Sequence, residues 1–379
     1  MNKTSIAWVR NPDGTPGFTW NPVKGCTPIS PGCAHCYASR LASTRLAHLP
    51  EYKGLAHDGK WTGEVRFFPE RLAEPLRHRK PAGIFLNDMG DTYHESVTFE
   101  QIAAMYGVMA ACPQHTFYVL TKRAKQRREW FGWLDTMAER CRSVFPYENH
   151  EWLRMHVLRA KVVRDAAARK MPSYTEMVAG GWPLPNVIEM STVCTQAETD
   201  RDIPELLQTP AARRGLSIEP MLEEIDIAHS GALGCNCEGE QCSGGCAWYK
   251  ACGKEGLSHR TDLVIIGGES GPHARPFQVD WARSIRDQCK AAGVAYFLKQ
   301  LGANCQTRND DNFTCGDGDI DFPGWPDHLA AEDRIEEIPQ GMEYQGAPVR
   351  LHFRDRAGAD PAEWRDDLRV REFPKETTP

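Results

Sequence analysis

The sequence has no run of about eighteen apolar residues, so no segment is long enough to cross a membrane as a helix. Its first residues, Met1 to Thr4, lead into Trp8 and Arg10 without an apolar signal segment, and we therefore expect a cytoplasmic protein. Positive charge is not in excess: 45 Lys and Arg against 51 Asp and Glu give a net charge of −6. This balance excludes a general attraction to nucleic acid or to an anionic membrane, so such ligands would need a local basic patch.

The common nucleotide-binding signatures are also missing. The turn Gly267 to Gly271 follows an apolar run, but it has neither the lysine of a P-loop nor the spacing of a dinucleotide fingerprint. Small residues after a parallel strand still leave backbone N–H groups accessible to a phosphate or carboxylate. Gly267, Gly268 and Glu269 are therefore candidate binding residues.

Cysteine, by contrast, is abundant, with 14 in 379 residues. Three of them, Cys26, Cys33 and Cys36, have the spacing C-x6-C-x2-C within a loop rich in glycine and proline. Three thiolates on one metal centre leave a position open for a substrate or cofactor, which favours an iron or zinc centre with an open position. The alternatives are a structural zinc site with His35 as fourth ligand, and unligated thiols.

A second cysteine group interrupts the chain between residues 229 and 260. Four ligands among its five thiols would make a closed zinc site, which a small insertion without a core of its own needs for stability. A second iron–sulfur cluster and free thiols are the alternatives. The candidate ligands are Cys235, Cys237, Cys242, Cys246 and Cys252.

Apolar periodicity predicts strands that alternate with helices up to about residue 300. Such alternation predicts a parallel sheet, either barrel-like or doubly wound. The predicted strands cover residues 18–21, 83–89, 116–121, 186–192, 214–219, 262–266 and 295–299. The predicted helices cover residues 34–47, 69–79, 98–112, 125–141, 151–171, 199–208 and 280–292.

Polar residues gather where these strands end. The carboxyl ends of parallel strands meet on one face, where sites are built from the following loops. Burying a charged group beside apolar strands is unfavourable unless the group is paired or binds a ligand. We therefore expect these residues either to form a functional site or to pair with one another across that face. The set consists of Asp88, Asp91, Lys122, Glu189, Thr192, Glu219, Glu269, Lys299 and Gln300.

Two basic segments are candidates for nucleic-acid binding. In residues 122–133, Lys and Arg are interleaved with Trp130, Phe131 and Trp133, as single-stranded nucleic-acid sites often require. The second segment covers residues 154–170. The alternative for both is a solvated helix face with its aromatic residues turned inward.

Together these motifs resemble a phage- and prophage-associated family with a three-cysteine motif that is treated as radical-SAM-like. The resemblance covers roughly residues 5–302, and it implies a partial (βα)6-type parallel barrel. Together with the cysteine-rich insertion at 229–260, we expect this barrel to form one domain over residues 1–302. The periodicity fades beyond Gly302, so we expect residues 303–379 to be a C-terminal extension. The matching segments are Phe18 to Pro22, Gly25 to Tyr37, Asn87 to Asp91, Val119 to Arg123, Leu216 to Pro220, Ile265 to Gly271, and Lys299 with Gln300.

The resemblance implies that Cys26, Cys33 and Cys36 hold a [4Fe-4S] cluster whose open iron binds S-adenosylmethionine. This loop is longer than the commonest radical-SAM loop, C-x3-C-x2-C, and the cysteine-rich insertion has no counterpart in the family core. The candidate cofactor-binding residues are Tyr37 for the adenine, and Asp88, Glu189, Gly267, Gly268 and Glu269 for the amino group and ribose. The candidate catalytic residues are Lys122, Glu219 and Lys299, of which we expect the two lysines to face a substrate phosphate or carboxylate.

Three functions remain open at this point. The first is a radical-SAM-like enzyme that acts on a nucleotide or nucleic-acid substrate, receives electrons from a donor protein and is encoded by a phage or prophage in its bacterial host. The second is a non-catalytic zinc protein that binds nucleic acid. The third is a divalent-metal nuclease that uses Asp88, Asp91, Glu219 and Glu269, which leaves the cysteine loop unexplained.

Overall fold

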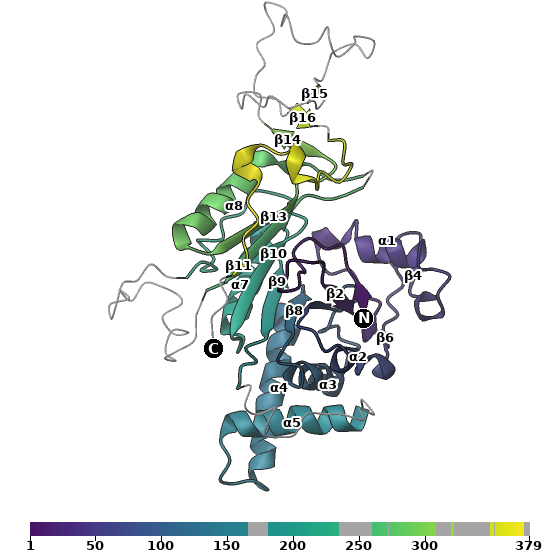
Figure 1. The fold of residues 1–379 in the computed structure, drawn as a ribbon, viewed down its shortest axis with the longest axis vertical. Coiled ribbons are helices and arrows are strands. Elements are labelled where there is room, and N and C mark those ends of the chain that lie inside the picture. Colours follow the sequence, from purple (N-terminus) through teal and green to yellow (C-terminus); the bar gives the residue numbers. More distant parts are fainter. Residues whose placement is uncertain are drawn as a thin grey trace, which may run out of the picture.

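The computed structural model describes residues 1–165, 181–234, 260–271, 273–307, 320–321, 349–351 and 353–374. Its centre is a mixed α/β arrangement built on one sheet of eight strands (Figure 1). From one edge to the other, the strands are β1 (Asn2–Lys3), β2 (Phe18–Trp20), β7 (Gly83–Leu86), β8 (Thr116–Thr121), β9 (Val187–Thr192), β10 (Arg213–Ile218), β11 (Leu263–Gly267) and β13 (Ala295–Gln300).

The strands from β2 to β13 are all parallel, and only the short edge strand β1 is antiparallel to its neighbour. The parallel sheet predicted from the alternation of strands and helices is therefore confirmed. The spatial order of these strands follows their order in the chain without a reversal. A doubly wound sheet reverses its order at a switch point, so this sheet is not of that kind. The sheet ends at β1 and β13, which are not neighbours in it.

Helices follow the strands at nearly all the predicted places. Thr98 begins one of them with a capping box, because its hydroxyl accepts from Gln101 N and its N–H donates to the Gln101 side chain. The helices are α1 (Tyr37–Ser43), α2 (Glu74–Arg77), α3 (Phe99–Ala110), α4 (Ala124–Arg142), α5 (His150–Asp165), α7 (Gln196–Gln208) and α8 (Val279–Ala292). The end of the helix predicted over 151–171 lies outside the described residues.

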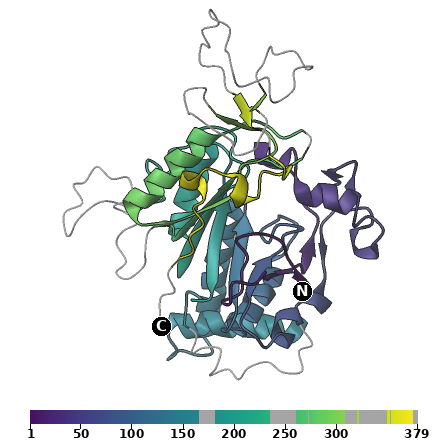
Figure 2. The same cartoon turned by 45° about the horizontal axis from the view of Figure 1, so that its top comes forward.

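Both faces of the sheet are covered, which explains why its strands are apolar throughout. Alternate residues such as Ile84 and Leu86 point into one core under α3, α4 and α5, which lie together in Figure 1. Their neighbours, such as Phe85, point to the other face. There the N-terminal segment lies across the strands (Figure 2). Its residues Trp8 and Val9 are buried in the core on this face.

Smaller elements flank the main sheet. Two short pairs precede β7: β3 (Val23–Lys24) with β6 (Arg66–Phe67), and β4 (Ala56–His57) with β5 (Lys60–Trp61). A second sheet is built from β12, which directly precedes α8, and from three strands after it; its order is β12 (Phe277–Gln278), β14 (Cys305–Thr307), β16 (Val349–Leu351) and β15 (Ile320–Asp321).

The C-terminal residues that the structure describes pack on the main sheet. Leu298 N donates to Val370 O at 3.1 Å and Glu372 N donates to Tyr296 O at 2.8 Å, so this segment covers the edge strand β13. Trp364 and Leu368 are buried in the same core as α8. The five cysteines predicted to bind a metal in the insertion, Cys235 to Cys252, lie outside the described residues. No helix among the described residues is long and apolar enough to span a membrane.

Candidate metal centre

A cavity of about 150 Å³ opens at the edge where the parallel strands end. Its lining includes all three cysteines of the C-x6-C-x2-C loop, Cys26, Cys33 and Cys36. The loop begins beyond β2, and the facing wall comes from residues at and just beyond the ends of β7, β8 and β9. Four of the other lining residues are Tyr37, Asp88, Lys122 and Thr192. The structure therefore brings the cysteine loop together with part of the predicted strand-end set.

The cysteine loop begins at a glycine that no other residue could replace without strain. Gly25 has a φ of +93°, and a Cβ there would lie 2.1 Å from Glu64 O. Its N–H donates to Met89 O at 3.0 Å, which ties the start of the loop to the segment after β7. Further on, Ser30 caps a short 3₁₀ helix over Pro31–Cys33, and α1 begins directly after Cys36.

Arg123 fixes the first part of the loop. Its guanidinium donates to Thr27 O at 3.0 Å, to Cys26 Sγ at 3.6 Å and to Asp91 Oδ2 at 3.1 Å. A further ion pair joins it to Glu95. The side chain is only 3% exposed, so these partners replace the water that the charge has lost. Arg123 therefore joins the cysteine loop to the ends of β7 and β8.

Glu269 and Arg275 fix the second part of the loop. Arg275 forms an ion pair with Glu269 and donates to Pro31 O at 3.0 Å, while His35 Nδ1 lies 3.0 Å from Glu269 Oε2. Burial opposes ionisation of Glu269, but the hydrogen bonds from Arg275 and His35 outweigh it and lower the pKa of this carboxyl to about 2. The predicted cofactor-binding residue Glu269 thus contacts the cysteine loop rather than the cavity.

The middle of the loop packs on a fourth cysteine. A Cβ added to Gly32 would lie 2.2 Å from the Sγ of Cys194, which is fully buried just beyond β9. Ser30 Oγ lies 4.0 Å from the same sulfur. Burial raises the pKa of the Cys194 thiol to about 11. Gly32 is therefore required for the loop to lie against β9.

Burial shifts the pKa of two groups in the cavity wall. Burial raises the pKa of the Cys26 thiol to about 12, with a further contribution from Asp91, while Arg123 opposes both. Burial also raises the pKa of Asp88, whose Oδ1 accepts from Asn21 Nδ2 at 2.5 Å. Tyr37 closes the same wall, since its hydroxyl donates to Asp88 O at 2.9 Å.

The three predicted catalytic residues have two different environments. Lys122 lines the cavity, and its ammonium makes no ion pair with any residue that the structure describes. Lys299 and Glu219 pair with each other at 2.9 Å from the ends of β13 and β10, outside the lining of the cavity. Only Lys122 is therefore both near the cysteines and available to a ligand.

The space next to the two predicted binding glycines, Gly267 and Gly268, is filled by other atoms of the chain. A Cβ on Gly268 would lie 2.4 Å from Leu301 O, and one on Gly267 would lie 3.3 Å from both Gln300 O and Glu219 Oε1. These glycines allow β11 and its neighbours to approach closely. Their place in the fold does not require a ligand.

Glu189 lies apart from the cavity. It is the third residue of β9 and points to the helix-covered face, where it is 2% exposed and accepts from the hydroxyls of Tyr93 and Tyr106. Burial raises its pKa, while Arg127 and the two tyrosines oppose that shift. The structure thus places this predicted cofactor-binding residue in the core.

In the first basic segment, Arg127, Trp130 and Phe131 are buried, whereas Lys125 and Arg128 are exposed. In α4, Arg127 and Trp130 are fully buried, and the Arg127 guanidinium donates to Met190 O and Ser191 Oγ. Arg128 pairs with Glu205. In the second segment, Arg154 pairs with Asp135 and Lys161 with Glu100, and its residues 166–170 lie outside the described part. The interleaving in residues 122–133 therefore reflects inward-facing aromatics.

Sequence reasoning missed the residues that hold the loop, namely Arg123, Arg275 and Cys194. Arg123 and Cys194 each lie two positions beyond the end of a strand, a signal that could have found them, whereas Arg275 lies eight positions beyond β11 and carries no such signal. Among the described residues, no group of three or more His, Cys, Asp or Glu side chains is arranged to hold a metal ion.

The fold and the site define a class of protein: a mixed α/β protein with a mostly parallel sheet and a three-cysteine cavity at its carboxyl edge. The chain belongs to the family of proteins of unknown function DUF5131, whose model matches residues 3–350. No curated protein and no solved structure matches the chain.

Proposed function

We propose that the protein is a radical-SAM-like [4Fe-4S] enzyme that acts on a nucleotide or nucleic-acid substrate. The observation that carries this proposal is that Cys26, Cys33 and Cys36 line one cavity at the carboxyl edge of a parallel sheet. The unreversed strand order supports an arrangement like that of an open, partial (βα)6-type barrel, in which sites form at this edge.

The donor chemistry of the residues around the cavity suits the cluster, and this chemistry, not a preformed arrangement of the sulfurs, supports the proposal. Three thiols are soft ligands that suit iron–sulfur clusters and zinc, and the guanidinium of Arg123 next to Cys26 Sγ offsets the negative charge of bound thiolates. His35, which a structural zinc would need as a fourth ligand, contacts Glu269 and lies outside the lining of the cavity. This arrangement favours a centre with three protein ligands over a closed zinc site.

In this proposal, residues of the chain bind the cluster and orient S-adenosylmethionine and the substrate. When bound, a [4Fe-4S] cluster with one iron free of protein ligands supplies an electron to the sulfonium of S-adenosylmethionine, which cleaves the bond to the 5′ carbon. Cys26, Cys33 and Cys36 would hold the cluster, and Asp88 and Tyr37 would orient the adenosyl part. Lys122 would bind a phosphate or carboxylate of the substrate. The largely apolar wall would exclude water and stray hydrogen donors, and an electron-donor protein is the partner that this chemistry requires.

The divalent-metal nuclease loses support from the geometry. Of its four proposed carboxylates, Asp91, Glu219 and Glu269 each pair with a cation, namely Arg123, Lys299 and Arg275. A carboxylate held in an ion pair is a poorer ligand for a divalent ion, because the cation competes with the metal. Only Asp88 of this set lines the cavity without a cationic partner among the described residues.

The test is formation of 5′-deoxyadenosine. Protein purified without oxygen is incubated with dithionite and S-adenosylmethionine, and the product is measured by liquid chromatography. We expect product from wild type and none above background from Cys33→Ala. The matched control is Cys141→Ala, which removes a partly exposed thiol of α4 outside the cavity and should retain wild-type product. Equal product from Cys33→Ala and wild type, or none from wild type with a bound cluster, would overturn the proposal.

A further inference from the structure

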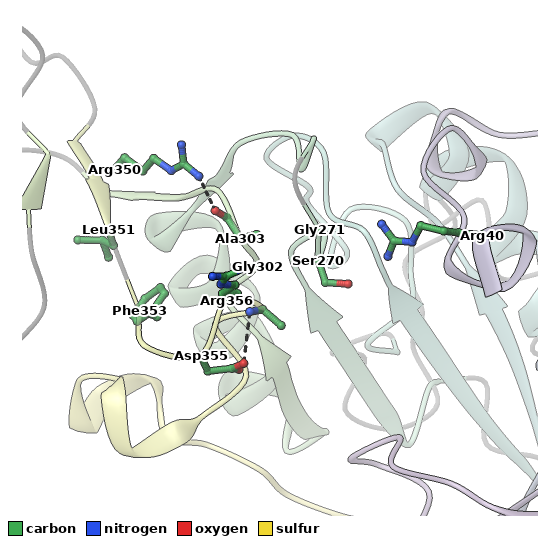
Figure 3. Close-up of a pocket in the computed structure, with 11 residues that line it drawn as sticks. Arg40, Ser270, Gly271, Gly302, Ala303, Arg350, Leu351, Phe353, Asp355 and Arg356 are labelled. Atoms are coloured by element: carbon green, nitrogen blue, oxygen red, sulfur yellow. Dashed lines mark hydrogen bonds between the residues drawn. The ribbon is translucent and has the colours of Figure 1, made fainter. Parts of the chain in front are cut away.

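A second and larger cavity adjoins the cysteine loop. It has a volume of about 650 Å³, within the range of ligand sites, and Figure 3 shows its lining. Three arginines line it: Arg40 from α1, Arg350 from β16, and Arg356 from the C-terminal segment. We call this cavity the arginine cleft.

The positive charge of the arginine cleft is not neutralised by the part of the chain that the structure describes. Arg40, Arg350 and Arg356 are exposed and make no ion pair with a described residue, and Arg350 donates to Ala303 O at 2.9 Å. The one carboxylate in the lining is Asp355. Its oxygens accept from the backbone N–H groups of the turn that follows it, at 3.4 Å from Ala357 and 2.5 Å from Ala359.

The backbone around the cleft leaves room for one of these cations. Gly271 has a φ of +114°, and a Cβ there would lie 2.5 Å from Arg40 Nη1. In Figure 3 the Arg40 side chain reaches from α1 toward Ser270 and Gly271. The absence of a side chain at Gly271 therefore allows the guanidinium to lie at the wall of the cleft.

Two elements connect the cleft with the cysteine cavity. Tyr37 lines the cavity and Arg40 lines the cleft, and these residues are three positions apart, about one turn, on α1. Glu269 holds the cysteine loop through His35, and the next residues, Ser270 and Gly271, line the cleft. A ligand in the cleft would therefore lie next to the proposed reaction centre.

We propose that the arginine cleft binds the phosphates of a single-stranded polynucleotide. A planar guanidinium matches a phosphate in two-point hydrogen bonding, and three of them on separate elements suit a chain of phosphates better than a single anion. Phe353, half-buried in the same lining, offers an aromatic face for a base. The inference deepens the proposed function by naming its substrate class, but the binding itself needs neither cluster nor S-adenosylmethionine.

The test is fluorescence anisotropy of the full-length protein with a labelled single strand of about 12 nucleotides, a length typical of such sites. Affinity is measured between about 50 and 200 mM salt, because each phosphate contact to a single strand contributes about 0.7 to the slope of log affinity against log salt. The variant is Arg40→Gln/Arg350→Gln/Arg356→Gln. The matched control is Arg45→Gln, which removes an exposed arginine five positions after Arg40 and outside the cleft.

We expect the triple variant to bind about tenfold or more weakly at low salt and to lower the slope by about 2, with Arg45→Gln like wild type. The three single variants, each lowering the slope by about 0.7, serve if the triple variant does not fold. Equal slopes for wild type and the arginine variants would overturn the inference. Equal binding of labelled polyglutamate would also overturn it, by showing that the cleft does not select phosphates. Formation of 5′-deoxyadenosine is measured without DNA, so the two proposals fail independently.

Discussion

The cysteine cavity and the arginine cleft are neighbours, but the arginines of the first are held in ion pairs and those of the second are not paired with any described residue. Around the cysteine loop, the cations Arg123 and Arg275 pair with buried carboxylates and also donate to loop backbone oxygens. In the arginine cleft, the cations have no such partners among the described residues. The paired arginines fix the conformation of the cysteine loop, whereas the exposed, unpaired arginines are available to a ligand. The comparison therefore separates the charges that hold the loop from those that can bind a substrate.

The largest effect is expected from removing the charge that holds the first part of the loop. Arg123→Gln leaves Asp91, 8% exposed, without its cation, and breaking a buried ion pair costs about 3–5 kcal/mol of unfolding free energy. Urea unfolding measures this loss. Arg128→Gln, which breaks a more exposed pair with Glu205, should cost at most about 1 kcal/mol. Similar losses for both variants would show that Arg123 is not a special anchor.

A smaller loss is expected where the loop lies against β9. Gly32→Ala places a methyl group where the Cys194 sulfur lies, and overpacking of this kind costs about 1–3 kcal/mol. Replacing Cys194 with Ala as well removes that sulfur, and the nearest remaining atoms lie 3.3 and 3.4 Å from the new methyl group. The double variant should therefore be more stable than the sum of the single variants predicts. Strict additivity in urea unfolding would contradict this packing.

The ion pair of Glu269 with Arg275, which holds the second part of the loop, should make the free energy of unfolding depend on pH. Because the pKa of Glu269 is lowered to about 2 in the folded protein, its ion pair stabilises the fold above the ordinary carboxyl pKa of about 4.5. That stabilisation is lost as pH falls from about 4.5 toward 2. The difference in unfolding free energy between wild type and Glu269→Gln should therefore shrink as pH falls over this window. The exposed control Glu64→Gln should change stability by less than about 0.5 kcal/mol throughout. A pH-independent difference for Glu269→Gln would contradict the account.

The smallest effect on stability is expected at the one unpaired cation of the cysteine cavity. Lys122→Gln breaks no ion pair with a described residue, so the unfolding free energy should change by less than about 0.5 kcal/mol. If Lys122 binds substrate as proposed, substrate affinity should fall while formation of 5′-deoxyadenosine without substrate is retained. A large loss of stability would instead make Lys122 an anchor like Arg123.

The sheet could be predicted from the sequence because it depends on local patterns. Apolar runs such as 83–86 and 263–266 and the helical periodicity between them sufficed to predict the parallel strands. The capping box at Thr98 and Gln101 likewise involves residues three positions apart. Such signals lie within one element, so a single sequence carries them.

The anchors of the loop could not be predicted, because they join residues far apart in the chain. Arg123 and Cys26 are 97 positions apart, and Arg275 and Pro31 are 244 positions apart. For Glu189 the prediction failed in the other direction, because it assigned a cofactor-binding role to a residue of the core. A carboxylate near the end of a strand can be assigned such a role wrongly when the face of the sheet to which it points is unknown. The odd position of Glu189 in β9 turns it to the helices, where Tyr93 and Tyr106 satisfy it.

The most direct test of the central claim is the metal content of the cysteine cavity. Iron, acid-labile sulfide and zinc are measured per chain for wild type and for Cys26→Ala/Cys33→Ala/Cys36→Ala, both purified without oxygen. The account predicts that the variant loses about four irons and about four sulfides relative to wild type, with zinc unchanged. Wild type without iron, together with zinc that is lost in the variant, would contradict it.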